Sequence, residues 1–160
     1  MHLNISENTS ICAEQPIILF ANAKEGAGNY KYNWSTGSTD NSILVQPDYT
    51  TAYGVTITDD CGNQLHDNVR IRVLQPVADF SYSYIDGREI RFSNSSSTEA
   101  IAFLWNFGNG DTSTLKEPIY SYPLPFEYIV KLVVENSIGC LDSTELEIVE
   151  PFQVFIPNSF

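Results

Sequence analysis

A recurring set of short alternating segments, each built around one tryptophan, constrains the fold of this chain most. In the second half, residues 104–107 include Trp105 and a glycine-containing turn follows. Residues 128–134 then alternate between outward-facing and inward-facing positions. Alternation with a period of two places every second side chain on one face of a strand, and short glycine-rich connections join neighbouring strands. The pattern therefore predicts antiparallel strands with a large aromatic side chain between their sheets.

The first half repeats this plan weakly. Trp34 lies within residues 32–37, Tyr53 opens a later alternating segment, and a turn with Cys61 precedes a last alternating segment. Short strands at this spacing are typical of immunoglobulin-like (Ig-like) sandwiches. We therefore predict an all-β chain of two tandem Ig-like β-sandwiches. The residues that we assign to their structural cores are Trp34, Tyr53, Trp105 and Tyr128.

The predicted domains are residues 1–75 and residues 76–150. A short connection with Pro76 separates them, and proline restricts the backbone there. Residues 151–160 lie beyond the last predicted strand of the second domain and alternate apolar side chains. We predict that they are a linker or the first strand of a further C-terminal domain.

Charge and hydropathy exclude several functional classes. The formal net charge is −12, from 8 basic and 20 acidic residues, so a nucleic-acid backbone would be repelled. No apolar run reaches the ~20 residues that a transmembrane helix needs. Without a signal peptide at Met1, a secreted chain of this kind is expected to be part of a longer precursor. We predict an extracellular location.

Three cysteines are few, but a disulfide between two of them would suit an oxidising compartment. Cys12 and Cys61 lie in the same half of the chain and are predicted to form a disulfide, which leaves Cys140 as an unpaired thiol.

The sequence offers no catalytic constellation. The histidines, His2 and His66, are not accompanied by a nucleophile in a recognisable pattern, and a zinc site needs more Cys and His. Glu145 and Glu147 alternate on one strand face, but glycoside hydrolysis needs two carboxylates across a cleft. We predict that the chain is not an enzyme and has no catalytic residues.

An aromatic stripe at Phe80, Tyr82 and Tyr84 allows two interpretations. Exposed rings would stack on sugars, whereas alternation with serine is what a strand facing the core produces. The core interpretation is preferred.

The second half resembles the PKD domain. The run Trp105-Asn106-Phe107-Gly108-Asn109-Gly110, the later Ser121-Tyr122 and the strand from Tyr128 carry this likeness, although Asn106 and Asn109 replace the usual aspartates. The resemblance implies an extracellular Ig-like sandwich that spaces, connects or binds. The first half is similar to Ig-like repeats of large Bacteroidota surface proteins, through Cys12 and the segments at 32–37 and 52–59.

Calcium is a further possibility that this resemblance implies, because some collagenase-related PKD domains bind Ca²⁺. Carboxylate and amide oxygens on turns suit this ion. The candidate ligands are Asn109, Asp111, Asp59 and Asp60. Ordinary hairpin hydrogen bonding is the preferred role of these residues, and we predict no other cofactor.

The segment Val154-Phe155-Ile156-Pro157-Asn158-Ser159-Phe160 resembles the opening of the gliding-motility-associated C-terminal domain. That domain is a sorting signal of the type IX secretion system, so the resemblance implies a Bacteroidota protein carried to the cell surface.

Two functions follow from these resemblances. The first is a non-catalytic stalk or adhesion module of a large type IX-secreted surface protein, similar to gliding-motility adhesins. The alternative is a carbohydrate- or protein-binding accessory module of a secreted polysaccharide hydrolase or protease. The expected partners are neighbouring domains of the same polypeptide, a surface glycan or protein, and the secretion machinery.

Overall fold

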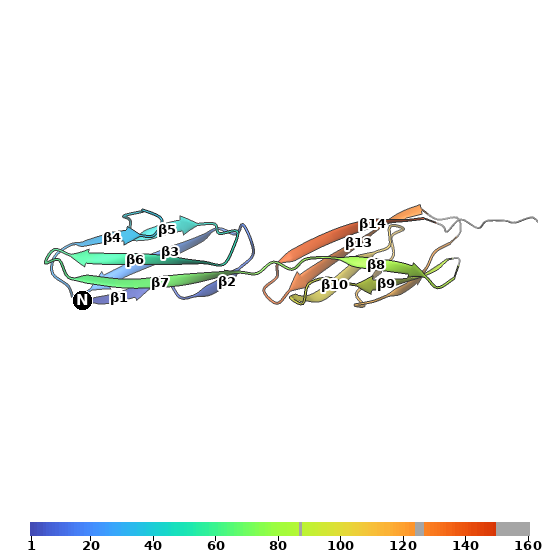
Figure 1. Ribbon diagram of the computed structural model, residues 1–160, viewed down its shortest axis with the longest axis horizontal. Coiled ribbons are helices and arrows are strands. Elements are labelled where there is room, and N and C mark those ends of the chain that lie inside the picture. The colour runs from blue at the N-terminus through green and yellow to red at the C-terminus, as the bar shows by residue number, and fades with distance from the viewer. Residues whose placement is uncertain (87, 124–126, 150–160) are drawn as a thin grey trace, which may run out of the picture. The chain divides into compact units, whose positions relative to one another are not determined.

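Every regular element in the described part of the chain is a β-strand (Figure 1). The computed structural model describes residues 1–86, 88–123 and 127–149. The chain divides into two compact units, Met1–Leu74 and Gln75–Phe160. Each unit has two sheets that enclose one hydrophobic core. The predicted all-β, sandwich-type fold class is confirmed, while the predicted segment 151–160 lies outside the described residues.

The first unit is built from two sheets of mainly antiparallel strands. Its strands are β1 (His2–Ile5), β2 (Thr9–Ile11), β3 (Ile17–Lys24), β4 (Tyr30–Trp34), β5 (Ser42–Val45), β6 (Thr51–Asp59) and β7 (Gln64–Val73). One sheet has the order β1-β3-β5 and the other the order β2-β7-β6-β4. Strand β2 pairs with β7 in parallel, with Thr9 opposite Ile71 and Ile11 opposite Val73.

The second unit has the same two-layer plan. Its strands are β8 (Phe80–Tyr84), β9 (Glu89–Asn94), β10 (Ala100–Asn106), β11 (Thr112–Ser113), β12 (Ile119–Ser121), β13 (Glu127–Asn136) and β14 (Leu141–Val149). The sheets have the orders β11-β10-β13-β14 and β12-β9-β8. Long antiparallel pairing of β13 with β14 matches the pairing of β6 with β7 in the first unit.

A buried tryptophan lies at the centre of each core. Trp34 on β4 is 2% exposed and Trp105 on β10 is fully buried. Each indole N–H donates to a backbone carbonyl of a connecting segment at 2.9 Å, from Trp34 Nε1 to Asp40 O between β4 and β5, and from Trp105 Nε1 to Leu115 O between β11 and β12. The ring therefore fills the inter-sheet space while its polar edge is satisfied. Tyr53 and Tyr128 are partly buried and pack against the two cores.

The aromatic stripe on β8 runs from the core to the edge of the second unit. Phe80 is buried and packs edge-on against Trp105 at 4.9 Å between ring centroids. Tyr82 is partly buried, and Tyr84 is 38% exposed. The Tyr84 hydroxyl donates to Val149 O at 2.6 Å, so it satisfies a backbone carbonyl on the edge strand β14.

The cysteines differ from the sequence prediction. Cys61 is an exposed free thiol, whereas Cys12 and Cys140 are both disulfide-bonded, so the predicted Cys12–Cys61 pair and the predicted unpaired Cys140 are wrong. The reason is the parallel pairing of β2 with β7, which places Cys12 just beyond the C-terminal end of β7. Cys61 precedes the N-terminal end of that strand, roughly 30 Å away at ~3.3 Å per residue, far outside disulfide range.

Replacing either tryptophan by alanine should destabilise its unit by ~3–5 kcal/mol, because a large core side chain and a loop hydrogen bond are both lost. Chemical denaturation of the W34A and W105A variants measures this change. Tyr49→Ala is the control, since Tyr49 is 81% exposed. A loss below ~1 kcal/mol in either tryptophan variant would contradict the assigned core.

The free cysteine gives a second expected result. Labelling of the denatured, non-reduced protein should modify one thiol per chain, at Cys61. Peptide mapping identifies the labelled residue, and Cys61→Ser should abolish labelling. Modification of Cys12 or Cys140 without reductant would contradict the structure.

Gly108 provides a third test, of the backbone after Trp105. Its φ is +82°, and a Cβ there would lie 2.6 Å from Ile129 O. Gly108→Ala should therefore cost more than ~1 kcal/mol of unfolding free energy, from backbone strain together with the clash. Gly110→Ala is the matched control, because Gly110 has φ +100° but open space at its Cβ position. Equal losses in both variants would exclude the steric contribution.

Candidate functional site

The turn between β10 and β11 brings two of the predicted site residues together. Asn109 Nδ2 donates to the Tyr120 hydroxyl at 2.7 Å, and that hydroxyl donates to the Asp111 carboxylate. Asn109 Oδ1 also accepts from the backbone N–H of Asp111 at 3.2 Å. Tyr120, on β12, thus links the two residues. The sequence analysis did not assign Tyr120 to the site. The only sequence signal was its position two residues before Tyr122, which would place both rings on one face of a strand.

The phenol of Tyr120 is held in its protonated state. Its ring stacks on Phe107 at 4.1 Å between centroids, and desolvation by burial raises the pKa of Tyr120. The Asn109 amide opposes this rise, and the Asp111 carboxylate adds to it. Because the phenol keeps its proton at neutral pH, it donates to Asp111, and one carboxylate oxygen is engaged in structure rather than open to a ligand.

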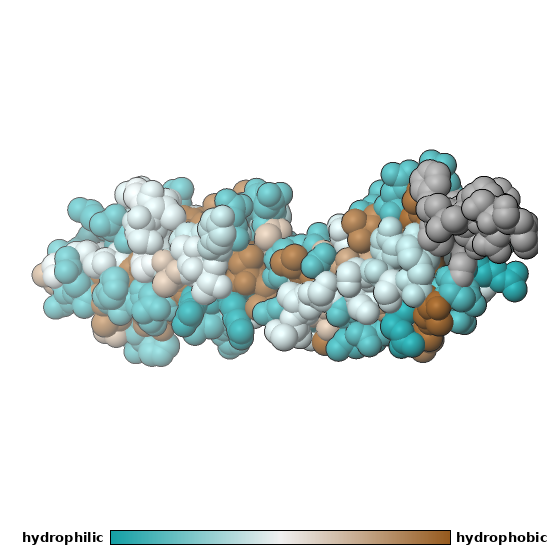
Figure 2. Space-filling model, turned by 45° about the vertical axis from the view of Figure 1, so that its right-hand side comes forward, coloured by the Kyte–Doolittle hydropathy of each residue, from teal (hydrophilic) through white to brown (hydrophobic). Residues whose placement is uncertain are grey.

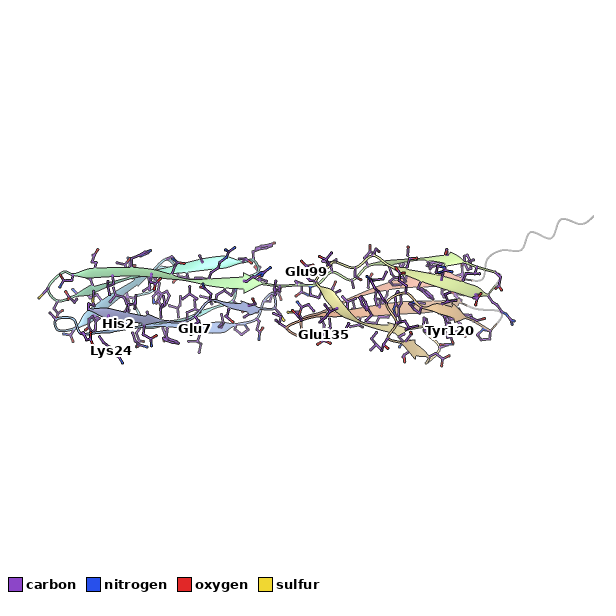
Figure 3. The ribbon with its side chains drawn as sticks, turned by 90° about the horizontal axis from the view of Figure 1, so that it is seen from below. His2, Glu7, Lys24, Glu99, Tyr120 and Glu135 are labelled. Carbon is purple, nitrogen blue, oxygen red and sulfur yellow. The ribbon has the colours of Figure 1, made fainter. Side chains whose placement is uncertain are left out.

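An open hollow of about 500 Å³ lies over this network. We refer to it as the hairpin hollow. Its lining residues are Phe107, Gly110, Asp111, Thr112, Ser113, Leu115, Pro118, Ile119 and Tyr120. Leu115 and Ile119 are 64% and 46% exposed. Tyr120, labelled in Figure 3, lies on β12, a short edge strand of the β12-β9-β8 sheet. Apolar side chains beside hydroxyl groups suit contact with a polymer surface.

The predicted pair Asp59 and Asp60 organises a turn in the first unit. The Asp59 carboxylate accepts from the backbone N–H groups of Cys61 at 3.0 Å and Asn63 at 2.9 Å, and from Asn63 Nδ2 at 2.9 Å. The Asn63 side chain is the main cause of the lowered pKa of Asp59. Asp60 Oδ2 accepts from the backbone N–H of Asn29 at 2.8 Å. Both carboxylates therefore stabilise loop structure.

These contacts bear on the calcium and catalytic predictions. Within residues 1–86, 88–123 and 127–149, no group of three or more His, Cys, Asp and Glu side chains is placed to hold a metal ion. The turn with Asn109 and Asp111 and the turn with Asp59 and Asp60 lie in different units. Calcium binding at either turn stays a prediction.

The histidines and the paired glutamates have other neighbours. His66 Nδ1 lies 3.1 Å from Thr56 Oγ1, and His2 is opposite Lys24 in the β1–β3 ladder (Figure 3). Glu145 forms an ion pair with Lys131 at 2.9 Å. None of these arrangements places a base beside a nucleophile with a third orienting group.

The surface is mainly hydrophilic in the view of Figure 2, with hydrophobic residues in small separate patches. One shallow apolar hollow of about 330 Å³ lies on the outer face of the β11-β10-β13-β14 sheet. Ala102, Leu104, Val133 and Leu141 contribute to its lining. In the described ranges, the chain contains no helix long and apolar enough to span a membrane.

Comparison with known proteins assigns the second unit. The PKD domain family matches residues 74–149. The pre-pro-metalloprotease PrtV of Vibrio cholerae is 35% identical over 89 residues, which are 54% of this chain and 9% of that protein. Collagenase ColA of Bacillus cereus is 40% identical over 62 residues, which are 36% of this chain and 6% of that protein.

Solved structures include further relatives. The crystal structure of the PKD1 domain from the Vibrio cholerae metalloprotease PrtV is 33% identical, with a TM-score of 0.45. The alignment covers 49% of this chain and all of that domain. The family match, together with the tryptophan, glycine and tyrosine positions described above, assigns a PKD domain to residues 74–149.

Proposed function

We propose that this chain is a non-catalytic extracellular accessory module that helps a larger secreted protease or polysaccharide hydrolase to hold its polymeric substrate. The observation that carries the proposal is the PKD domain at residues 74–149, whose relatives include a metalloprotease and a collagenase. In those relatives the matched segment is less than a tenth of the protein, as expected for an appended module.

The site geometry supports a binding role over a catalytic one. The polar residues at the turn of the second unit are engaged with one another, and Asp59 and Asp60 are engaged with backbone N–H groups. The accessible surface of the hairpin hollow combines the exposed apolar side chains of Leu115 and Ile119 with hydroxyl groups and the exposed Asp111 carboxylate. Such a surface makes contacts with a polymer, and it lacks the activated nucleophile that hydrolysis needs.

A second candidate function rests on the sequence of residues 154–160. Its likeness to the opening of a gliding-motility-associated domain favours a stalk or adhesion module of a type IX-secreted cell-surface protein of the Bacteroidota. These residues lie outside the described part of the chain. The reading frame of the gene tests this candidate: a G-D-G motif shortly after residue 160 supports it, and a frame without one removes its basis.

The accessory-module proposal predicts binding to an insoluble polymer without its degradation. The full chain should co-sediment with fibrillar collagen or with an insoluble polysaccharide such as chitin or cellulose, and should release no soluble fragments. Leu115→Asp should weaken this binding about tenfold, because it places a charge on the rim of the hairpin hollow.

Ile101→Asp is the matched control, because Ile101 and Leu115 are both 64% exposed in the same unit and Ile101 does not line the hollow. Its binding should equal that of the unmodified chain. Failure of the chain to sediment with every polymer, or release of fragments, would overturn the proposal. Equal loss in both variants would exclude the hairpin hollow as the contact.

A further inference from the structure

The outer face of the β2-β7-β6-β4 sheet in the first unit carries polar and basic side chains that have no part in the proposed function above. The strand register determines which side chains lie on this face: Lys31 is opposite Thr58, Asn33 opposite Thr56, and Thr56 opposite His66. The rows continue with Gly54 opposite Asn68, Ala52 opposite Arg70, and Ser10 opposite Arg72. Alternation places Trp34, Val55, Val69 and Ile71 on the buried side. We refer to the exposed side as the arginine face.

The middle strand of the arginine face carries small side chains. On β6 these are Ala52, Gly54, Thr56 and Thr58. The flanking strands carry longer side chains at opposite ends of β6, with Arg70 opposite Ala52 and Lys31 opposite Thr58. With ~4.8 Å between neighbouring strands, the floor between the two flanking strands is about 10 Å wide. The small side chains of β6 therefore form a low strip on this face, which we refer to as the trough.

Gly54 lies in the floor of this trough, in a continuous register without a bulge. A Cβ at Gly54 would lie 3.3 Å from Cε1 of His66, so the imidazole packs closely over the bare backbone. A small hollow of about 170 Å³ opens here, and Asn33, Ser35, Thr56 and His66 contribute to its lining. Amide, hydroxyl and imidazole groups are suited to hydrogen bonding with a hydroxyl-rich ligand.

Two arginines occupy the other end of the arginine face. Arg70 and Arg72 are both exposed and lie two residues apart on one side of β7, so their Cα atoms are about 7 Å apart. They line an open hollow of about 380 Å³ with Asn8, Thr9 and Ser10. The backbone N–H of Arg70 donates to Asn8 Oδ1 at 2.6 Å, which holds the Asn8 side chain beside the arginines. Among the described residues, neither guanidinium forms an ion pair.

The charge of the arginine face contrasts with that of the chain. The outward register positions on β4, β6, β7 and β2 include Lys31, Arg70 and Arg72, and none of these positions is Asp or Glu. The chain as a whole has a formal net charge of −12. An anionic ligand is therefore repelled by most of the surface and attracted to this face.

We propose that the arginine face binds an acidic polysaccharide, with one carboxylate or sulfate group held by Arg70 and Arg72. A planar guanidinium pairs with such oxyanions through two parallel N–H···O bonds. The neutral polar groups along the trough then bind the hydroxyls of neighbouring sugars. An acidic peptide fits less well, because none of the exposed large hydrophobic residues lies at an outward position of the trough to receive apolar side chains.

This inference deepens the proposed function and rests on it only in treating the chain as a binding module. Affinity electrophoresis or titration calorimetry of the full chain tests it with polygalacturonate and dextran sulfate as probes. Dextran is the neutral control, and poly-glutamate represents an acidic peptide. The chain should bind at least one of the two polyanionic glycans and neither control, and the affinity should fall as salt is added. Comparison of the two glycans distinguishes carboxylate from sulfate recognition.

The double variant R70Q/R72Q should lose at least about tenfold in affinity for the bound glycan, because both charge-assisted contacts are removed. The variant R91Q/K116Q is the matched control. It removes the same amount of charge from exposed positions of the second unit and should bind like the unmodified chain. All four substituted residues are exposed, and circular dichroism verifies that both variants remain folded.

Three outcomes would overturn the inference. These are absence of binding to either glycan, equal weakening in the two double variants, and equal or tighter binding of poly-glutamate. The proposed function is judged separately, by co-sedimentation with insoluble polymers and by the Leu115→Asp variant. A chain that passes that test while R70Q/R72Q leaves glycan affinity unchanged retains the accessory role without this site.

Discussion

Each unit of this protein depends on one buried tryptophan that acts on both the sheets and a loop. The indole fills the space between two sheets, and its N–H donates to a carbonyl of a connecting segment. The acceptor is Asp40 between β4 and β5 in the first unit, and Leu115 between β11 and β12 in the second. The connection is thereby fixed against the sandwich. In the second unit this connection contributes to the hairpin hollow, so the same hydrogen bond that satisfies Trp105 also holds Leu115 in its lining.

The polar residues of the second unit show how a turn can resemble a metal site and serve a structural purpose. Asn109 and Asp111 are carboxamide and carboxylate groups on a glycine-rich turn, which is the composition expected for calcium ligands. The Tyr120 hydroxyl lies between them, accepting from one and donating to the other. A tyrosine phenol is protonated at neutral pH, and burial raises the pKa of Tyr120 further, so its hydroxyl donates to one oxygen of the Asp111 carboxylate.

The two units offer different surfaces for binding. The hairpin hollow of the PKD domain combines exposed Leu115 and Ile119 with hydroxyl groups. The arginine face of the first unit is polar and carries a local positive charge on a strongly acidic chain. Apolar contact and charge-assisted hydrogen bonding respond differently to salt, because only the second is screened by ions. The two contributions are therefore separable in binding experiments at several ionic strengths.

Local sequence was sufficient to determine the strand character of this protein and the burial of its two tryptophans. Period-two alternation depends only on side chains two residues apart, and a large ring in such a strand has little alternative to the core. The resemblance to the PKD domain likewise came from short runs around Trp105 and Tyr128. The family match at residues 74–149 supports this resemblance.

Only the tertiary structure decided which strands are neighbours. The parallel pairing of β2 with β7 joins segments about sixty residues apart, and nothing in the short run Thr9–Ile11 specifies that partner or its direction. That pairing separates Cys12 from Cys61, and it places Asn8 and Ser10 beside Arg70 and Arg72. Tyr120 meets Asn109 and Asp111 for the same reason, because contacts between strands depend on register and sheet packing, which local alternation leaves open.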